Sequence, residues 1–342
     1  MATVTTRTLS FREAINEAIR LEMRRDPTVI LMGVDVAGGA RTHLEEKGGE
    51  AWGGDLGVTK GLVQEFGRSR VLDTPISESS FIGAAVGAAS TGLRPIAELM
   101  FVDFFGVCMD QIFNQGGKMR YMFGGKAKVP MVVRTLYGAG FRAAAQHSAC
   151  LYSVFVHMPG LKVVVPSTPY NAKGLLTAAI RDDDPVIYFE HLVLLDSSGP
   201  VPEDEYVVPL GKAEIARSGK DATVVAIGRM RQFALEAADA LAKDGVDVEV
   251  VDPQSLSPLD ESTILESVKK THRLVVVDED NPRCSVANDI VALAAQQAFG
   301  YLDAPPQAVT APHTPVPFSP VLEDAYIPCP DKIAAAVKAV VA

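Results

Sequence analysis

Short apolar segments alternate with helix-like segments along almost the whole chain, and this alternation constrains the fold more than any other feature. Strand-like runs occur at 29–34, 95–101, 129–135 and 161–166, and helical signals separate most of them. Parallel strands need such crossover segments, and the crossover helices then cover both faces of the sheet. The sequence therefore predicts an α/β fold built on a parallel sheet.

The alternation occurs twice, on either side of a segment at 196–209 that is rich in Ser, Gly, Pro and acidic residues. Such a composition is typical of a linker. We therefore expect a first α/β domain over 1–195, a linker over 196–209 and a smaller second α/β domain over 210–342. The second block lacks a strand followed by G-x-G-x-x-G, which argues against a dinucleotide site there.

Local signals indicate where the helices begin. Ser10 and Glu13 have the spacing of a capping box, which predicts a helix that starts there and ends near Arg24. A second helix is expected to start at Asp103 and to reach Tyr121. A short helix is expected to open at 143–148 and to close at Pro159-Gly160. A last helix is expected to start at Asp331.

Composition excludes several classes of protein. The formal net charge is −10 and no basic stripe occurs, which argues against nucleic-acid binding. No apolar run has the roughly 18–20 residues that a membrane span needs, and the N-terminus lacks the order of a secretory signal. The four cysteines are scattered without a metal or disulfide spacing, so we expect reduced thiols and a cytoplasmic location.

One stretch combines a carboxylate with a helix of very small residues. Asp73-Thr74-Pro75-Ile76-Ser77-Glu78 reads as an extended, proline-stiffened segment, and the helix that follows ends near Gly92. Gly83 and Gly87 lie four residues apart, so they share a face that another backbone can approach closely. This pattern indicates a carboxylate at a dry interface. A second candidate segment is the glycine-rich loop at 37–60, whose length is typical of functional loops.

Several motifs together resemble one known family. The chain resembles, over nearly its whole length, the beta subunit of the thiamine-diphosphate-dependent first component of 2-oxo acid dehydrogenase complexes. Within that family it looks most like the acetoin dehydrogenase branch, on the segments 50–62, 120–126 and 311–320. The general motifs are Asp73-Thr74-Pro75-Ile76-Ser77-Glu78, Gly92-Leu93-Arg94-Pro95, Ala144-Ala145-Gln146-His147-Ser148, Pro159-Gly160-Leu161-Lys162-Val163-Val164 and Ala179-Ile180-Arg181-Asp182.

The resemblance implies a fold and an activity. The fold is a pyrimidine-binding parallel-sheet domain followed by a transketolase C-terminal-like α/β domain. The activity is cleavage of acetoin to acetaldehyde and an enzyme-bound two-carbon carbanion, which is passed as an acetyl group to lipoamide of an acyltransferase component. Two alternatives stay open. The same machinery could act on pyruvate or a branched-chain 2-oxo acid, or the chain could be a non-catalytic docking subunit.

The resemblance also implies roles for four residues. Glu78 would hydrogen-bond the pyrimidine ring nitrogen of thiamine diphosphate and drive its imino tautomer, a role that suits a carboxyl in a dry site. Phe104 would stack on the pyrimidine face, and Ile76 would also contact the cofactor. His147 would relay protons near the reacting end or guide the lipoyl sulfur. The remaining histidines match no motif and are expected to be structural or surface residues: His43, His157, His191, His272 and His313.

Two ions follow from the same resemblance. Family members often carry a potassium ion bound by backbone carbonyls and a carboxylate, ligands that suit a hard cation. The diphosphate itself needs magnesium, usually bound by Gly-Asp-Gly and a later Asn, and no Gly-Asp-Gly occurs in this chain. We therefore expect an alpha subunit to hold the magnesium and the diphosphate, in an assembly of two alpha and two beta subunits. The positions that match the potassium site are Met131, Ala179, Ile180, Asp182 and Asp184.

Overall fold

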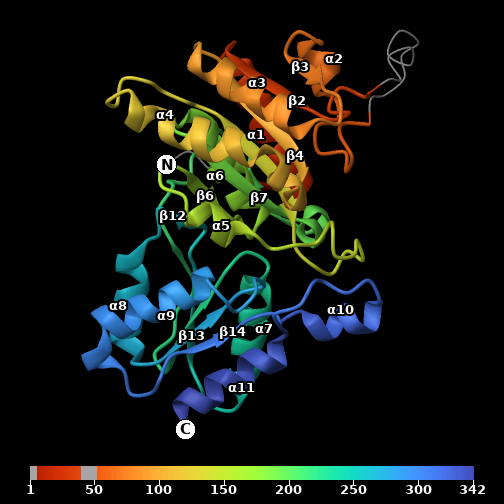
Figure 1. Cartoon of the computed structure of the whole chain (residues 1–342). Helices are drawn as coiled ribbons and strands as arrows, with labels where there is room; N and C mark the ends of the chain where they lie inside the picture. The colour runs from red at the N-terminus through yellow and green to blue at the C-terminus, as the bar shows by residue number, and fades with distance from the viewer. Residues whose placement is uncertain (1–5, 40–51) are drawn as a thin grey trace. The chain divides into compact units, whose positions relative to one another are not determined.

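Two largely parallel sheets organise the computed structural model, which describes residues 6–39 and 52–342 (Figure 1). The chain divides into two units, each described here by itself. The first unit comprises Met1–Leu136, His157–Glu190 and Leu194–Leu210, and the second comprises Tyr137–Val156, His191–Val193 and Gly211–Ala342. The α/β class predicted from the alternating pattern is confirmed.

The sheet of the first unit has the strand order β6-β7-β5-β4-β2-β3. The pairs β2–β3, β2–β4, β4–β5 and β6–β7 are all parallel. Their apolar runs are buried, as expected for strands covered on both faces. The strands are β2 (Val29–Gly33), β3 (Val71–Asp73), β4 (Arg94–Phe101), β5 (Val132–Tyr137), β6 (Lys162–Val164) and β7 (Val186–His191).

Helix α1 (Phe11–Arg25) begins at the predicted capping box. The Glu13 amide donates to Ser10 Oγ at 3.2 Å, and the Ser10 amide donates to Glu13 Oε2 at 2.8 Å. The apolar face of α1 packs against α6 (Pro169–Arg181), whose N-cap is Thr168. The remaining helices of this unit are α2 (Leu62–Phe66) and α3 (Glu78–Ser90), and α3 lies against β4.

The segment after β4 is less regular than predicted. A single helix from Asp103 to Tyr121 was expected, but the chain forms the 3₁₀ helix η2 (Val102–Cys108), the π-helix η3 (Gln111–Gly116) and α4 (Gly117–Met122). The prediction that Asp103 caps this region was wrong, because Phe101 occupies the N-cap position. Short 3₁₀ and π segments are frequent near functional sites.

One other local prediction was wrong in part. The short helix expected to open at 143–148 and close at Pro159-Gly160 begins only at Tyr152, as α5 (Tyr152–Val156), because Ala144 has a φ of 63° and cannot belong to a right-handed helix. The segment predicted as a linker contains β8 (Ser198–Pro202), which pairs antiparallel with β1 (Thr6–Ser10). The helix η4 (Leu192–Asp196) precedes β8.

The second unit contains a five-stranded sheet in the order β14-β13-β10-β11-β9. Helices α7 and α11 lie on one side of β13 and β14, and α8 and α9 lie on the other (Figure 1). The sequence predicted β10, α7, β11, α8, β13, α9 and α11, but not β9, β12, η5, β14 or α10. The bounds are β9 (Glu214–Arg217), β10 (Ala222–Ala226), α7 (Met230–Lys243), β11 (Val248–Asp252), β12 (Ser255–Ser257), α8 (Glu261–Thr271), β13 (Leu274–Val277), α9 (Val286–Gln297), η5 (Phe299–Tyr301), β14 (Gln307–Val309), α10 (Pro320–Tyr326) and α11 (Pro330–Val341).

Within the described ranges, the helices are all too short or too polar to cross a membrane.

Candidate functional site

The motif that ends in Glu78 follows the carboxyl end of β3, the strand at one edge of the first sheet. Glu78 is the first residue of α3 and is half-buried. Ile76, two residues earlier, is 80% exposed, which is high for such an apolar side chain. The structure therefore places a carboxylate at a helix N-terminus beside an uncovered apolar group, within the first unit.

Phe104 lies in η2, which packs against the start of α3. The hydroxyl of Ser79 donates to the backbone oxygen of Val107, and this bond joins the two elements. Phe104 is half-buried and meets Phe101 edge to face, with ring centroids 5.9 Å apart. Two sequence-predicted site residues, Glu78 and Phe104, therefore come from adjacent elements of one unit.

The thiol of Cys108, at the end of η2, is affected by the negative charge of Glu78. Burial, and after it the negative charge of Glu78, raise the pKa of this thiol to about 12. Cys108 is fully buried at the end of η2 and donates to the backbone oxygen of Phe105 at 3.4 Å. The carboxylate of Glu78 thus acts electrostatically on the interior of the segment that carries Phe104.

The two glycines of α3 have different surroundings. A Cβ added at Gly83 would lie 3.2 Å from Cγ of Gln111 in η3, so this position is in close contact within the chain. A Cβ added at Gly87 would meet nothing within 4 Å, and Gly87 is exposed. Only Gly87 therefore has open space in front of it for another chain.

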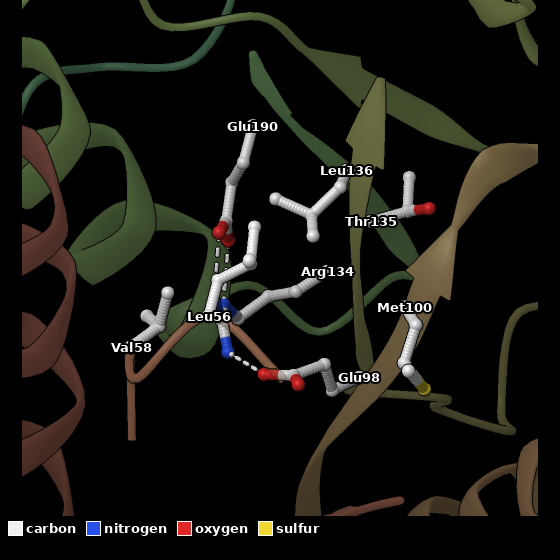
Figure 2. A pocket seen from close by; sticks show the side chains of 8 residues that line it. All are labelled: Leu56, Val58, Glu98, Met100, Arg134, Thr135, Leu136 and Glu190. Atoms are coloured by element: carbon white, nitrogen blue, oxygen red, sulfur yellow. Dashed lines mark hydrogen bonds and ion pairs between the residues drawn. The ribbon is translucent and has the colours of Figure 1, made fainter. Parts of the chain in front are cut away.

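A small pocket lies in the first unit beneath the segment at 52–60 (Figure 2). At its floor, Arg134 of β5 lies between Glu98 of β4 and Glu190 of β7. Arg134 donates two bonds to Glu190, at 2.6 and 2.8 Å, and one to Glu98 at 2.8 Å. The apolar lining residues are Leu56, Val58, Met100 and Leu136.

Burial controls the electrostatics of this triad, which we define as Glu98, Arg134 and Glu190. Arg134 is 2% exposed, and burial works against its charge, but the two carboxylates raise its pKa above the ordinary value. Burial also raises the pKa of Glu98 and of Glu190, and Arg134 opposes that rise. Two buried carboxyls share the single guanidinium of Arg134, so each depends on its positive charge to offset the cost of burying a negative charge.

The positions predicted to bind potassium lie together in the first unit, but side-chain cations already contact their oxygens. Arg94 Nη1 donates to the backbone oxygens of Ile180 and Asp182, at 3.1 and 2.8 Å. Lys162 Nζ lies 2.7 and 2.6 Å from the carboxylate oxygens of Asp182. Several of these oxygens therefore already have cationic partners, and the potassium site stays a prediction that these contacts do not support. Three matching positions remain: Met131, Ala179 and Asp184. The Met131 oxygen accepts from the Val186 amide, and the Ala179 oxygen accepts from the Asp182 amide. Asp184 pairs with Arg120.

His147 belongs to the second unit, in the segment Tyr137–Val156. It is half-buried in a turn in which its amide donates to the Ala144 oxygen at 3.4 Å, and α5 begins only at Tyr152. The prediction of a histidine at a helix start was therefore wrong about the helix. His147 is instead held on an irregular loop, where catalytic side chains are frequent.

Three consecutive acidic residues follow β13 in the same unit and are all buried: Asp278, Glu279 and Asp280. Burial raises the pKa of Asp278 to about 6, although the hydrogen bond from Tyr152 opposes this. Burial and the neighbouring charge of Asp278 raise the pKa of Asp280 to about 7. Burial would also raise the pKa of Glu279, but hydrogen bonds from His191 and from the Ala139 amide, together with the charge of Arg229, lower it overall.

The other histidines agree with a structural or surface role where the structure describes them. His191 is fully buried and lies 2.8 Å from Glu279. His272 forms the C-cap of α8, and its Nδ1 lies 2.8 Å from the Tyr301 oxygen. His157 and His313 are exposed, and His43 lies outside the described residues, as does part of the glycine-rich loop at 37–60.

The sequence reasoning missed both buried acidic clusters. A signal was present for each one. Glu98, Arg134 and Glu190 interrupt otherwise apolar strands, and charged residues are almost never fully buried unless they are paired. Asp278-Glu279-Asp280 directly follows the apolar strand at 274–277, at the edge where parallel strands present functional groups.

Comparison with known domain families defines the class of protein. Residues 7–196 match the family described as "Transketolase, pyrimidine binding domain", and residues 211–333 match "Transketolase, C-terminal domain". A solved structure described as "Split gene transketolase, inactive beta4 tetramer" superposes with a TM-score of 0.77 at 21% identity, over 97% of this chain and 98% of that one. The fold is therefore that of a transketolase-type protein.

Relatives of known function narrow the class further. The chain is 64% identical to the acetoin:2,6-dichlorophenolindophenol oxidoreductase subunit beta of Bacillus subtilis, over 96% of this chain and 95% of that protein. It is 60% identical to the subunit of the same name in Cupriavidus necator, over 97% of each. Identity to the pyruvate dehydrogenase E1 component subunit beta of Rhizobium meliloti is 46%, over 97% of this chain and 70% of that protein. The chain belongs to the family of thiamine-diphosphate-dependent dehydrogenase beta subunits.

Replacing Arg134 by Met is expected to lower the free energy of unfolding by about 3–5 kcal/mol, because two buried carboxyls lose their shared cation. Urea unfolding followed by circular dichroism measures this change. The matched control is Arg24→Met, since Arg24 is largely exposed and pairs with Glu65 in a solvent-screened ion pair, so its loss should change stability far less. Equal losses in the two variants would contradict the interpretation.

Replacing Asp280 by Asn is expected to change how stability depends on pH. The raised pKa of Asp280 means that the folded chain binds a proton that the unfolded chain releases, so this contribution is present below about pH 4 and is lost as the pH rises through about 7. The unfolding free energy of the wild type minus that of Asp280→Asn should therefore fall by more than about 1 kcal/mol between about pH 4.5 and about pH 7.5. The exposed control Asp244→Asn should show no such fall.

Proposed function

We propose that the chain is the beta subunit of an acetoin dehydrogenase. With its partners it cleaves acetoin to acetaldehyde and an acetyl group that passes to lipoamide of an acyltransferase component. The observation that carries this proposal is the identity of 64% and 60% to two acetoin oxidoreductase beta subunits over nearly the whole chain, against 46% for the pyruvate enzyme subunit. Glu78, the first residue of α3, also supports the proposal, because the proposed reaction needs a carboxyl group beside the cofactor.

The residues around Glu78 fit the pyrimidine half of thiamine diphosphate. Ile76 offers an exposed apolar side chain, and Phe104 offers an aromatic ring on the element that packs against α3. The carboxylate of Glu78 lies near Cys108 of η2. Burial is the largest cause of the raised pKa of Cys108, and the negative charge of Glu78 is the second. An aromatic face, an apolar surface and a carboxyl are the groups that hold a planar, nitrogen-containing ring.

The diphosphate half of the cofactor needs a metal ion to balance its charge. Among residues 6–39 and 52–342 no cluster of three or more His, Cys, Asp or Glu side chains could hold a metal ion. We infer that an alpha subunit supplies magnesium and the diphosphate contacts, in a heterotetramer of two alpha and two beta subunits. The space in front of Gly87, in the last turn of α3, is open, and the side chains of Ile76 and Val107 near its start are exposed. These features support a partner chain along α3.

When bound, thiamine diphosphate supplies the carbon nucleophile that such carbon–carbon cleavage requires. Glu78 would hold a proton at its carboxyl group for the pyrimidine ring nitrogen of the bound cofactor. Phe104 would stack on that ring, and Ile76 would contact it. His147 would transfer a proton near the reacting carbonyl, a task that an imidazole can perform.

Further parts of the proposal rest on fewer observations. All four cysteines are free thiols, which supports a reducing, cytoplasmic location. A potassium ion stays a prediction without support from the geometry, since Arg94 and Lys162 contact the matching oxygens. An alternative substrate is pyruvate, which the relative at 46% identity favours by its name, or a branched-chain 2-oxo acid.

Replacing Glu78 by Gln is expected to lower kcat of the reconstituted alpha–beta complex at least about 100-fold, the size of one lost acid–base contribution. Steady-state turnover of acetoin with lipoamide measures the change. The matched control is Glu266→Gln, an exposed glutamate on α8, which should keep the wild-type kcat. A Glu78→Gln complex as active as this control would favour a non-catalytic docking subunit.

The proposed substrate predicts a preference that the same complex reveals. We expect kcat/KM for acetoin to exceed that for pyruvate by at least about tenfold, because differential binding in the transition state sets such ratios. Both compounds are assayed at several concentrations with lipoamide as acceptor. Equal or faster turnover of pyruvate would assign the chain to the oxidative decarboxylases.

A further inference from the structure

The segment Tyr137–Val156 of the second unit has an unusual backbone before His147. Gly138 and Gly140 have φ values of 98° and 102°, and the non-glycine residues Arg142 and Ala144 have φ values of 66° and 63°. Left-handed non-glycine residues persist only where the surrounding structure fixes them, and they cluster at functional sites. The conformation of this segment therefore requires specific contacts to hold it.

The acidic residues that follow β13 supply three of these contacts, each at a different point of the segment. The Ala139 amide donates to Glu279, and the Tyr152 hydroxyl donates to Asp278. Ser153 Oγ donates to Asp280 Oδ2 at 2.5 Å. Three consecutive carboxylates thus fix the segment on both sides of His147.

Glu323 of α10 supplies the contacts closest to the strained residues. Its side chain is fully buried, and its Oε1 accepts from the Gly140 amide at 2.6 Å. Its Oε2 accepts from Arg142 Nη1 at 2.7 Å, while Arg142 Nη2 donates to Asp324 at 2.6 Å. One carboxylate therefore binds the backbone and a side chain of the same turn, which pins the conformation of Arg142.

Gly138 and Gly140 are the positions where the segment comes too close to its surroundings for a side chain. A Cβ at Gly138 would lie 2.3 Å from His191 Nε2, and one at Gly140 would lie 2.6 Å from Arg229 Nη1. His191 Nδ1 accepts from the Val193 amide at 3.1 Å, so Nε2 carries the hydrogen that is donated to Glu279 Oε2. His191 thereby orients the same carboxylate that holds Ala139.

We propose that Glu279 and Glu323, together with Asp278 and Asp280, are positioning residues that hold His147 in the geometry its chemistry requires. These carboxylates come from the end of β13 and from α10, in the C-terminal part of the chain, whereas His147 lies far earlier in the sequence. The inference rests on the role proposed above for His147. It adds a task for the second unit that is independent of cofactor binding.

Hydrogen exchange on the full chain tests the anchoring without any need for activity. In Glu323→Gln, the amides between Ala139 and Ser148 should exchange about tenfold faster or more, the size expected when a hydrogen bond to a charged group is lost. Peptides from α7 should be unchanged, which shows that the fold is intact. The control Asp244→Asn, exposed and remote in sequence, should exchange as the wild type does. Unchanged exchange in Glu323→Gln would overturn the proposal.

Turnover of the alpha–beta complex then tests whether the anchor acts through His147. Glu323→Gln should lower kcat about tenfold with little change in KM, and it should cause no further loss in a His147→Asn background. Losses that multiply in the double variant would show an independent structural effect and overturn the proposal. If Glu323→Gln does not fold, Ser153→Ala removes the bond donated to Asp280 and the bond accepted from the Val286 amide, and it is subject to the same two criteria.

The two levels of inference fail differently. A His147→Asn complex with the wild-type kcat would refute the catalytic role of His147, and the positioning role with it, while the substrate preference would be unaffected. A loss of acetoin preference would instead refute the proposed substrate and leave the exchange and double-variant results in force.

Discussion

A parallel sheet covered on both faces is the constraint on which the rest of the structure depends. Strands β5 and β7 are buried along their whole length and β4 along most of it, so any charge within them must be paired there. Arg134 between Glu98 and Glu190 meets that condition across three neighbouring strands of the first unit. The pairing keeps the centre of the sheet intact close to the pocket beneath residues 52–60.

The same geometry explains where the candidate site residues occur along the chain. Parallel strands end at one edge of their sheet, and the loops that follow carry the functional groups. Glu78 follows β3, Phe104 follows β4 and His147 follows β5. In the second unit, Asp278 to Asp280 follow β13 in the same way. The candidate residues and the carboxylates of Asp278 to Asp280 thus arise from one structural rule applied in two sheets, whereas Glu323 comes from helix α10.

Much of the fold followed from local pattern, and the failures have identifiable causes. The capping box at Ser10 and the alternating strands and helices were readable because their determinants lie within a few residues of one another. The helix expected to open at 143–148 begins only at Tyr152, because Ala144 has a left-handed backbone, and the turn before it is held by bonds to Glu279 and Glu323 from far along the chain. No neighbouring residue carries that information.

The sequence by itself determined the α/β class, the places of most strands and helices, and the family, because periodicity and motif are local properties. It also singled out Glu78, Phe104 and His147 as candidates. Only the tertiary structure decided which buried charges pair, since Glu98, Arg134 and Glu190 come from separate strands, and how the loop before His147 is held. Those contacts join residues far apart in the chain, and their energies depend on burial, which spacing along a sequence does not encode.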